Sequence, residues 1–143
     1  MIKTKKILIV AANYYPNITN KLILNSKKTL DKSKKIRNKI KIILSPGVFE
    51  IPVIISKNIN KFDGFIALGC IIKGKTAHFN LISQSVSWGI MDLSIKYKKP
   101  IGNGIISCFN MKQAIERSRP NNKNKGSESA NALLSVLEKF SNS

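Results

Sequence analysis

The hydrophobic positions of the chain fall into two kinds of pattern, and each kind predicts one type of element. Four short segments are almost continuously apolar and rich in β-branched residues, which is typical of strands buried on both faces of a parallel sheet. They cover residues 5–12, 40–44, 63–69 and 101–107. The second segment is followed by a Pro-Gly pair, which ends a strand.

Helices are predicted between and after these segments, where apolar residues recur every three or four positions. They are expected at residues 18–30, near 52–57, at 79–97, at 111–118 and at 130–140. Asn17 is the expected N-cap of the first helix, because its side-chain oxygen can accept a hydrogen bond from an amide of the first turn. The core face of the long helix is expected to comprise Leu81, Ile82, Val86, Ile90 and Leu93.

Strands that alternate with helices predict βαβ units, and therefore a four-stranded parallel sheet with helices on both faces. The predicted class is α/β, a three-layer αβα sandwich formed as a single domain over residues 1–143. Ligands bind such sheets at the carboxyl ends of the strands. Four segments occupy those positions, namely 13–16, 45–50, 70–78 and 107–110. We therefore look for the functional site in these segments.

The net charge of the chain is large, but it says less about function than its magnitude suggests. The net charge is +18, from 25 Lys and Arg against 7 Asp and Glu, and it favours an anionic partner. Only three of the basic residues are Arg, and Lys is accompanied by abundant Ile and Asn, which AT-rich codons also encode. We interpret most of the charge as compositional bias on a solvated surface, and nucleic acid is not the expected partner. A basic α/β module that binds nucleic acid stays as an alternative.

The number of cysteines and the hydropathy of the chain indicate in which cellular compartment the protein is expected. Cys70 and Cys108 are too few to stabilise a fold of this size by disulfides, so a reduced, cytoplasmic protein is expected. Both are interpreted as small buried side chains. No apolar segment is long enough for a membrane helix, and no secretory signal is recognised. One histidine, two separated cysteines and few carboxylates do not make a metal site.

Residues 69–76, with the sequence G-C-I-I-K-G-K-T, match the P-loop pattern of nucleotide-binding proteins. We reject nucleotide binding because none of the three aspartates closes an apolar strand, where a P-loop enzyme needs an acidic residue to hold Mg²⁺. The β-branched residues between the glycines also resist the tight curl that surrounds a phosphate. Amides near the start of a helix, with Lys75 and Thr76, would still bind an anion, and the phosphate of a small molecule is the expected ligand.

Four further residues are candidates for chemistry. His78 is the sole histidine and lies just beyond this anion site, where it could transfer protons near neutral pH, although a structural role is the alternative. Glu50 lies in an apolar turn and suits the NH or OH groups of a ligand. Tyr14 and Tyr15 follow the first predicted strand, where a ring could stack on a planar ligand, or simply cover the edge of the core. The residues thus predict a protein that binds a small phosphorylated anion and a planar partner.

Four segments resemble motifs of the 6,7-dimethyl-8-ribityllumazine synthase family, in order and at compatible spacing. Residues 45–52, S-P-G-V-F-E-I-P, resemble V-P-G-A-F-E-I-P. Residues 67–79, A-L-G-C-I-I-K-G-K-T-A-H-F, resemble A-L-G-x-V-I-R-G-x-T-x-H-F/Y. Residues 110–117, N-M-K-Q-A-I-E-R, resemble N-x-x-Q-A-x-x-R, and residues 124–128, N-K-G-S-E, resemble N-K-G-x-E. The resemblance extends over residues 7–137 and explains the P-loop match as a coincidence.

The resemblance implies a transferase of riboflavin synthesis with two small-molecule substrates. It would condense 5-amino-6-(D-ribitylamino)uracil with 3,4-dihydroxy-2-butanone 4-phosphate, releasing phosphate and water without a cofactor or metal. It also implies a flavodoxin-like strand order and a homo-oligomer, a pentamer, with sites at subunit interfaces. A non-catalytic relative that binds a lumazine or flavin is the other alternative.

The resemblance also implies roles for individual residues. His78 would donate and shuttle protons. The ribitylaminouracil would be bound by Tyr14, Val48, Phe49, Glu50, Cys70, Ile71, Ile72 and, from a neighbouring subunit, Asn103. The butanone phosphate would be held by Lys75, Thr76, Arg117 and Lys125, with Arg117 reaching across an interface. The sequence departs from the family pattern at four positions. Tyr15 stands where the family commonly has Asn, and Val48 stands where it has Ala. Lys75 replaces a common Glu or small residue, and Asn103 replaces a common Phe.

Overall fold

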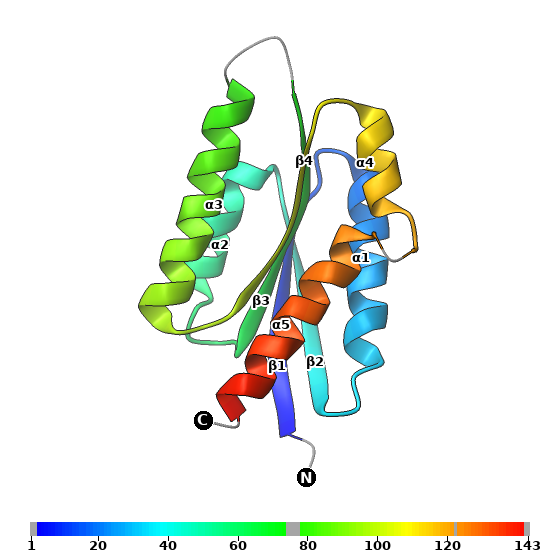
Figure 1. The fold of residues 1–143 in the computed structure, drawn as a ribbon. Coiled ribbons are helices and arrows are strands. Elements are labelled where there is room, and N and C mark those ends of the chain that lie inside the picture. The colour runs from blue at the N-terminus through cyan, green and yellow to red at the C-terminus, as the bar shows by residue number, and fades with distance from the viewer. Residues whose placement is uncertain (1–2, 74–77, 122, 142–143) are drawn as a thin grey trace.

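One four-stranded parallel sheet organises the molecule (Figure 1). The computed structural model describes residues 3–73, 78–121 and 123–141. Its strands are β1 (Lys3–Ala12), β2 (Ile36–Ser45), β3 (Gly64–Ile72) and β4 (Ile101–Cys108). They lie in the order β2-β1-β3-β4, and all neighbouring pairs are parallel. The predicted α/β class and the flavodoxin-like order are confirmed.

Helices cover both faces of this sheet (Figure 1). One face carries α1 (Pro16–Asp31), α4 (Met111–Ser118) and α5 (Lys125–Ser141). The other carries α2 (Ile51–Lys57), preceded by the short 3₁₀ helix η1 (Val48–Glu50), and α3 (His78–Tyr97). Within the described residues, none of these helices combines the length and hydropathy that a bilayer crossing requires.

The central strands explain why the apolar segments do not alternate with polar residues. Side chains of β1 point in turn to the two faces, with Ile7 and Ile9 in the core under α1 and α5 and Leu8 and Val10 in the core under α2 and α3. β3 is likewise buried on both faces. In the edge strand β4, buried residues alternate with more exposed ones, and in the edge strand β2 only the two end residues are buried, because each edge strand has a neighbour on one side only and incomplete helix cover.

Three local predictions are wrong. α1 already begins at Pro16, so Asn17 lies in the first turn and caps nothing; proline suits that start because its missing N–H would have no helical partner. α5 begins at Lys125 rather than near 130, because Asn124 Oδ1 accepts a hydrogen bond from the Ser127 amide at 3.0 Å and caps the helix there. Leu81 is 63% exposed and does not belong to the core face of α3.

Candidate active site

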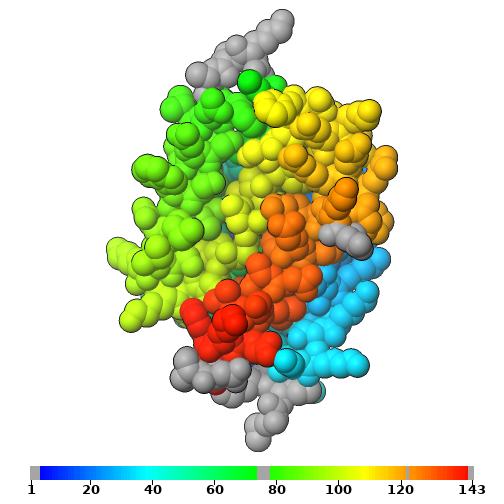
Figure 2. All heavy atoms as spheres, viewed as in Figure 1, coloured from blue at the N-terminus to red at the C-terminus, as the bar shows by residue number. Residues whose placement is uncertain are grey.

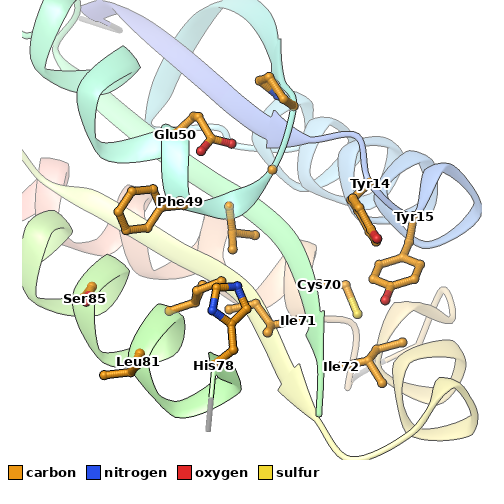
Figure 3. Close-up of a pocket in the computed structure, with 14 residues that line it drawn as sticks. Tyr14, Tyr15, Phe49, Glu50, Cys70, Ile71, Ile72, His78, Leu81 and Ser85 are labelled. Carbon is orange, nitrogen blue, oxygen red and sulfur yellow. The ribbon is translucent and has the colours of Figure 1, made fainter. Parts of the chain in front are cut away.

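A cavity of about 810 Å³ opens at the carboxyl edge of the sheet (Figure 3). Three of the four predicted segments line it. They contribute Tyr14 and Tyr15 after β1, residues 46–50 after β2, and residues 70–72 at the end of β3 together with His78 beyond that strand. The fourth segment, 107–110, does not line it. The cavity is thus built where parallel strands end and their connections diverge, as expected for this class of sheet.

Two tyrosines form one wall of the cavity (Figure 3). Their rings meet edge to face, with centroids 4.9 Å apart. Tyr15 packs against the core, and burial together with the neighbouring Tyr14 raises the pKa of its hydroxyl. Tyr14 is 71% exposed and offers its ring to a ligand. The turn that carries them is anchored by Thr19, whose Oγ1 donates to the carbonyl of Ala12 at 2.6 Å.

The turn after β2 places the carboxylate of the site. The Ser45 hydroxyl donates to the Gly47 carbonyl at 2.5 Å and holds the turn, which leads directly into η1. Glu50 is half-buried at the end of η1, and its carboxylate faces the cavity (Figure 3). A Cβ on Gly47 would lie 3.1 Å from Glu50 Oε1, so the glycine gives the carboxylate room.

Val48 departs from the smaller alanine of the family pattern, and the structure shows how it fits. Its side chain is 8% exposed and lies over Gly69 of β3. A Cβ on Gly69 would come within 2.6 Å of Val48 Cγ1, so a glycine there is required by this packing. The larger residue therefore fills space above β3, and Phe49 beside it stays exposed at the cavity mouth.

The first half of the P-loop pattern, residues 69–72, does not have the conformation of a phosphate-binding loop. These four residues are extended and belong to β3. The last three residues of the pattern, Gly74, Lys75 and Thr76, lie outside the described residues, and so do the anion-binding roles predicted for Lys75 and Thr76. Since a phosphate loop begins after the strand rather than within it, the extended segment supports the rejection of nucleotide binding.

His78 is the first residue of α3 and lines the cavity (Figure 3). Leu81, Ile82 and Ser85 line it as well, and the sequence analysis did not assign them to the site. They follow His78 by three, four and seven positions, which places all four side chains on one face of a helix. That spacing is the signal in the sequence, but a helical period alone predicts a core face there. Pro46 and Gly47 also line the cavity without having been predicted as site residues, whereas Tyr15 is one of the two predicted tyrosines.

Three residues predicted to bind a substrate do not line the cavity, namely Arg117 and Lys125 for the phosphate and Asn103 for the ribitylaminouracil. Arg117 lies exposed on α4, and its Nη1 donates to the Ser107 carbonyl at 3.0 Å. Lys125 opens α5 and pairs with Glu128 Oε1 at 2.9 Å. Asn103 is exposed on the edge strand β4, where its Oδ1 accepts from the Ile105 amide. None of these three side chains lines the cavity of its own subunit, although Arg117 lies near enough to Cys70 to lower the pKa of that thiol.

A buried amide positions Arg117 and Lys125. Asn124 is fully buried, and its Nδ2 donates to the carbonyls of Ser118 and Arg119 at the end of α4. Its Oδ1 caps α5 through the Ser127 amide. One side chain thus joins the end of α4, which carries Arg117, to the start of α5, which carries Lys125. Replacement of such a satisfied buried amide leaves unpaired backbone groups in the core.

Cys70 reaches the cavity from β3, and its side chain is a protonated thiol rather than the thiolate that acts as a nucleophile. Burial, and then the nearby Cys108, raise the pKa of Cys70 to about 12, and the charge of Arg117 opposes the rise only in part. Both cysteines are buried, as predicted from the sequence. Within the described residues, no group of three His, Cys, Asp or Glu side chains gathers as a set of metal donors.

We expect Cys70 to resist alkylation in the folded protein. Because the thiolate is the reactive species and its pKa is raised, iodoacetamide at pH 8 should modify Cys70 roughly two to three orders of magnitude more slowly than in denaturant. Mass spectrometry of the Cys70 peptide over time measures this rate. The same reaction in 8 M urea is the control, and equal rates in the two conditions would contradict the buried thiol.

The chain matches known proteins over almost its whole length. A family model described as 6,7-dimethyl-8-ribityllumazine synthase matches residues 4–141. A 6,7-dimethyl-8-ribityllumazine synthase of Bartonella tribocorum is 36% identical over 140 residues, covering 96% of this chain and 91% of the relative. One from Agrobacterium fabrum is 35% identical and covers 92% of each chain. One from Vesicomyosocius okutanii is 35% identical, covering 93% of this chain and 84% of the relative.

These matches include all four motifs recognised in the sequence, and two of those motifs, at 45–52 and 67–79, supply most of the cavity wall. The chain therefore belongs to the 6,7-dimethyl-8-ribityllumazine synthase family.

Proposed function

We propose that the cavity condenses 5-amino-6-(D-ribitylamino)uracil with 3,4-dihydroxy-2-butanone 4-phosphate to give 6,7-dimethyl-8-ribityllumazine, phosphate and water. Lumazine synthase activity in riboflavin biosynthesis accords with the family of the chain. The observation that carries the proposal is the convergence of two family motifs, which bring Glu50 and His78 to one cavity from different elements (Figure 3). The two free, buried cysteines fit a reducing compartment, so we propose that the enzyme acts in the cytoplasm.

The ribitylaminouracil is proposed to lie against the tyrosine wall. Its flat ring suits the exposed face of Tyr14, and the apolar side chains of Phe49, Ile71 and Ile72 suit its edges. A carboxylate only accepts hydrogen bonds, so Glu50 would bind the ring NH groups or the ribityl hydroxyls. Val48 and Cys70 complete the wall on this side. Aromatic walls with one buried acceptor are typical of small-molecule sites.

Positioning supplies a large part of the proposed catalysis. The amine of one substrate attacks the ketone of the other, and an imine forms with loss of one water. Phosphate is then eliminated, and the ring closes with loss of a second water. Holding both substrates together in the reactive orientation accelerates the first step. His78 would give a proton to the departing groups and take protons from the attacking amine, since an imidazole can do both near neutral pH.

The phosphate is proposed to be bound by Lys75, Thr76 and Lys125, with Arg117 reaching in from a neighbouring subunit. Asn103 of a neighbour is proposed to bind the ribitylaminouracil. Arg117, Lys125 and Asn103 do not line the cavity of their own subunit, which is consistent with such sharing. Arg117 and Lys125 are cations, and a guanidinium can bind two phosphate oxygens at once.

The surface of α3 supports a homo-oligomer, which we propose to be a pentamer. Leu81, Trp88, Met91 and Ile95 are large, apolar and exposed, and their spacing of seven, three and four places them along one stripe. Contiguous apolar surface of this kind marks protein interfaces. The edge strand β4, which carries Asn103, lies between α3 and α5 on the face that Figure 2 shows.

Incubation of the purified protein with both substrates tests the proposed reaction. The product is expected to appear as lumazine fluorescence, with inorganic phosphate released in equal amount and no metal or nucleotide added. Omission of either substrate is the control. Tight binding of a lumazine without turnover would instead indicate a non-catalytic relative, and absence of both would overturn the proposal.

Replacing His78 by alanine should lower kcat by roughly 10- to 100-fold, at or below the lower end of general acid–base effects, because we expect the uncatalysed condensation itself to be fast. Steady-state rates at saturating substrates measure the loss. Ser83→Ala, one turn further along α3, is the matched control and should keep full activity. A folded His78→Ala protein with the wild-type rate would remove His78 from the mechanism.

A further inference from the structure

A second cavity, of about 610 Å³, lies beside the tyrosine wall, between the first turns of α1 and α4. Tyr14 and Tyr15 line both cavities, and their rings extend from the turn that leads into α1 (Figure 3). The other residues that line the second cavity belong to α1 and α4, and none of them lines the substrate cavity. Since α1 and α4 cover the face of the sheet opposite α3, this cavity does not coincide with the apolar stripe of the proposed subunit contact.

The lining of the second cavity combines apolar surface with one cation. Met111 and Ile115 are one helical turn apart on α4, and their side chains are 41% and 38% exposed. Lys21 of α1 supplies the cation, and none of the described residues that line the cavity is an Asp or a Glu. Small-molecule sites have a volume of this order and join apolar walls to a few polar groups. The unopposed positive charge favours an anionic ligand.

The order of the polar groups along α1 indicates the shape of that ligand. Tyr14, at the start of the helix, is 71% exposed and offers a flat ring. Asn17, Asn20 and Lys21 lie on one face of α1, because they are three and four residues apart. Lys21 comes five residues after Pro16, which is ~7.5 Å along the helix axis. A ring stacked on Tyr14 would therefore have the two carboxamides at its edge and the ammonium group beyond it.

We propose that the second cavity binds a planar heteroaromatic ring that carries a phosphate group. The ring stacks on Tyr14, the carboxamides of Asn17 and Asn20 donate to and accept from its heteroatoms, and Lys21 binds the phosphate. Because Tyr14 lines both cavities, a ligand stacked on it from this side draws the ring away from the ribitylaminouracil. The ligand thus acts as an inhibitor, and this last consequence rests on the proposed function.

Flavin mononucleotide is the probe, because it is a planar heteroaromatic phosphate whose fluorescence is quenched when its ring stacks on an aromatic side chain. The titration is carried out in about 150 mM KCl, which screens unspecific attraction to a chain of net charge +18. We expect saturable binding with quenching. Lumichrome has the ring without the phosphate, and inorganic phosphate lacks the ring, so each should bind at least ~10-fold more weakly.

Four variants assign the bound flavin to a cavity. Lys21→Gln should weaken binding at least ~10-fold, because a charge-assisted hydrogen bond is lost. Ile115→Glu should weaken it further, because its carboxylate would face the phosphate. Lys28→Gln removes the same charge two turns further along α1, and Phe49→Ala alters only the substrate cavity, so both should bind as the wild type does. Thermal unfolding verifies that each variant is folded.

Three results would overturn the site: no flavin bound, equal losses in Lys21→Gln and Lys28→Gln, or a loss in Phe49→Ala without one in Lys21→Gln. None of these measurements involves a substrate, so they stand whether or not the condensation proposed above is found. If it is found, flavin mononucleotide should raise the KM for the ribitylaminouracil in the wild type, and at least ~10-fold more flavin should be needed in Lys21→Gln. A wild type that saturating flavin does not inhibit would refute the link through Tyr14.

Discussion

Replacing Arg117 by alanine should raise the KM for 3,4-dihydroxy-2-butanone 4-phosphate by roughly 100-fold, because two charge-assisted hydrogen bonds to phosphate are lost. The KM for the ribitylaminouracil should change by less than about threefold, since that substrate carries no phosphate for the guanidinium to bind. Steady-state kinetics with each substrate varied in turn measure the two values.

The structure makes Arg117 available for this role. One of its N–H groups donates to the Ser107 carbonyl, but a guanidinium has five donors and the side chain is exposed. That hydrogen bond orients the group at the end of α4 while other donors can reach a neighbouring subunit. Arg117→Lys is the matched variant, because it keeps the charge and loses the paired geometry, and it should recover only part of the affinity.

The shared site can be tested by mixing two impaired variants and assaying them at a concentration of 3,4-dihydroxy-2-butanone 4-phosphate far below the raised KM of Arg117→Ala. Arg117→Ala and Glu50→Ala subunits, dissociated and reassembled together, should regain some activity, because some interfaces then combine an intact Glu50 with an intact Arg117. Wild-type protein treated in the same way is the control for reassembly. If the control recovers and the mixture does not, Arg117 does not act across an interface.

Replacing Gly126 by alanine should lower the free energy of unfolding by about 3 kcal/mol, at the upper end of the range for overpacking. A Cβ at this position would lie 2.2 Å from the Leu22 carbonyl oxygen and 2.9 Å from Asn124 Oδ1. Both are parts of rigid structure, namely the backbone of α1 and the capped start of α5, so α5 would have to move away from α1. Urea unfolding at a fixed protein concentration measures the change.

Gly89→Ala is the control for this substitution. Gly89 lies inside α3, where a Cβ would be 3.3 Å from two carbons of Pro52, and alanine improves helix propensity by ~1 kcal/mol. The net change should therefore stay within about 1 kcal/mol. Equal stability of wild type and Gly126→Ala would contradict the close approach of α1 and α5.

The class of the fold and the edge of the sheet at which the cavity opens follow from the amino-acid sequence alone. Continuous apolar segments identify β1 and β3 because a strand covered on both faces has no solvent side, and the alternation with helices implies parallel pairing. Glu50, Tyr14 and His78 could be assigned because they follow strands, and parallel strands bring their ends to one edge. The helix at 111–118 is also found as predicted, with Asn110 capping it.

Features that depend on how distant segments pack could not be predicted from local patterns and become visible in the three-dimensional structure. A 3.6-residue period shows that Leu81 and Ile82 share a face with His78, but that face is half core and half cavity, and only the position of η1 and β3 beside α3 separates the two. The early start of α5 depends on Asn124, which bridges two helices. The 4.0 Å approach of Cys70 and Cys108 depends on the register of β3 against β4, which no local pattern encodes. Periodicity reports which side of an element is apolar, whereas contacts between elements are set by the packing of the whole chain.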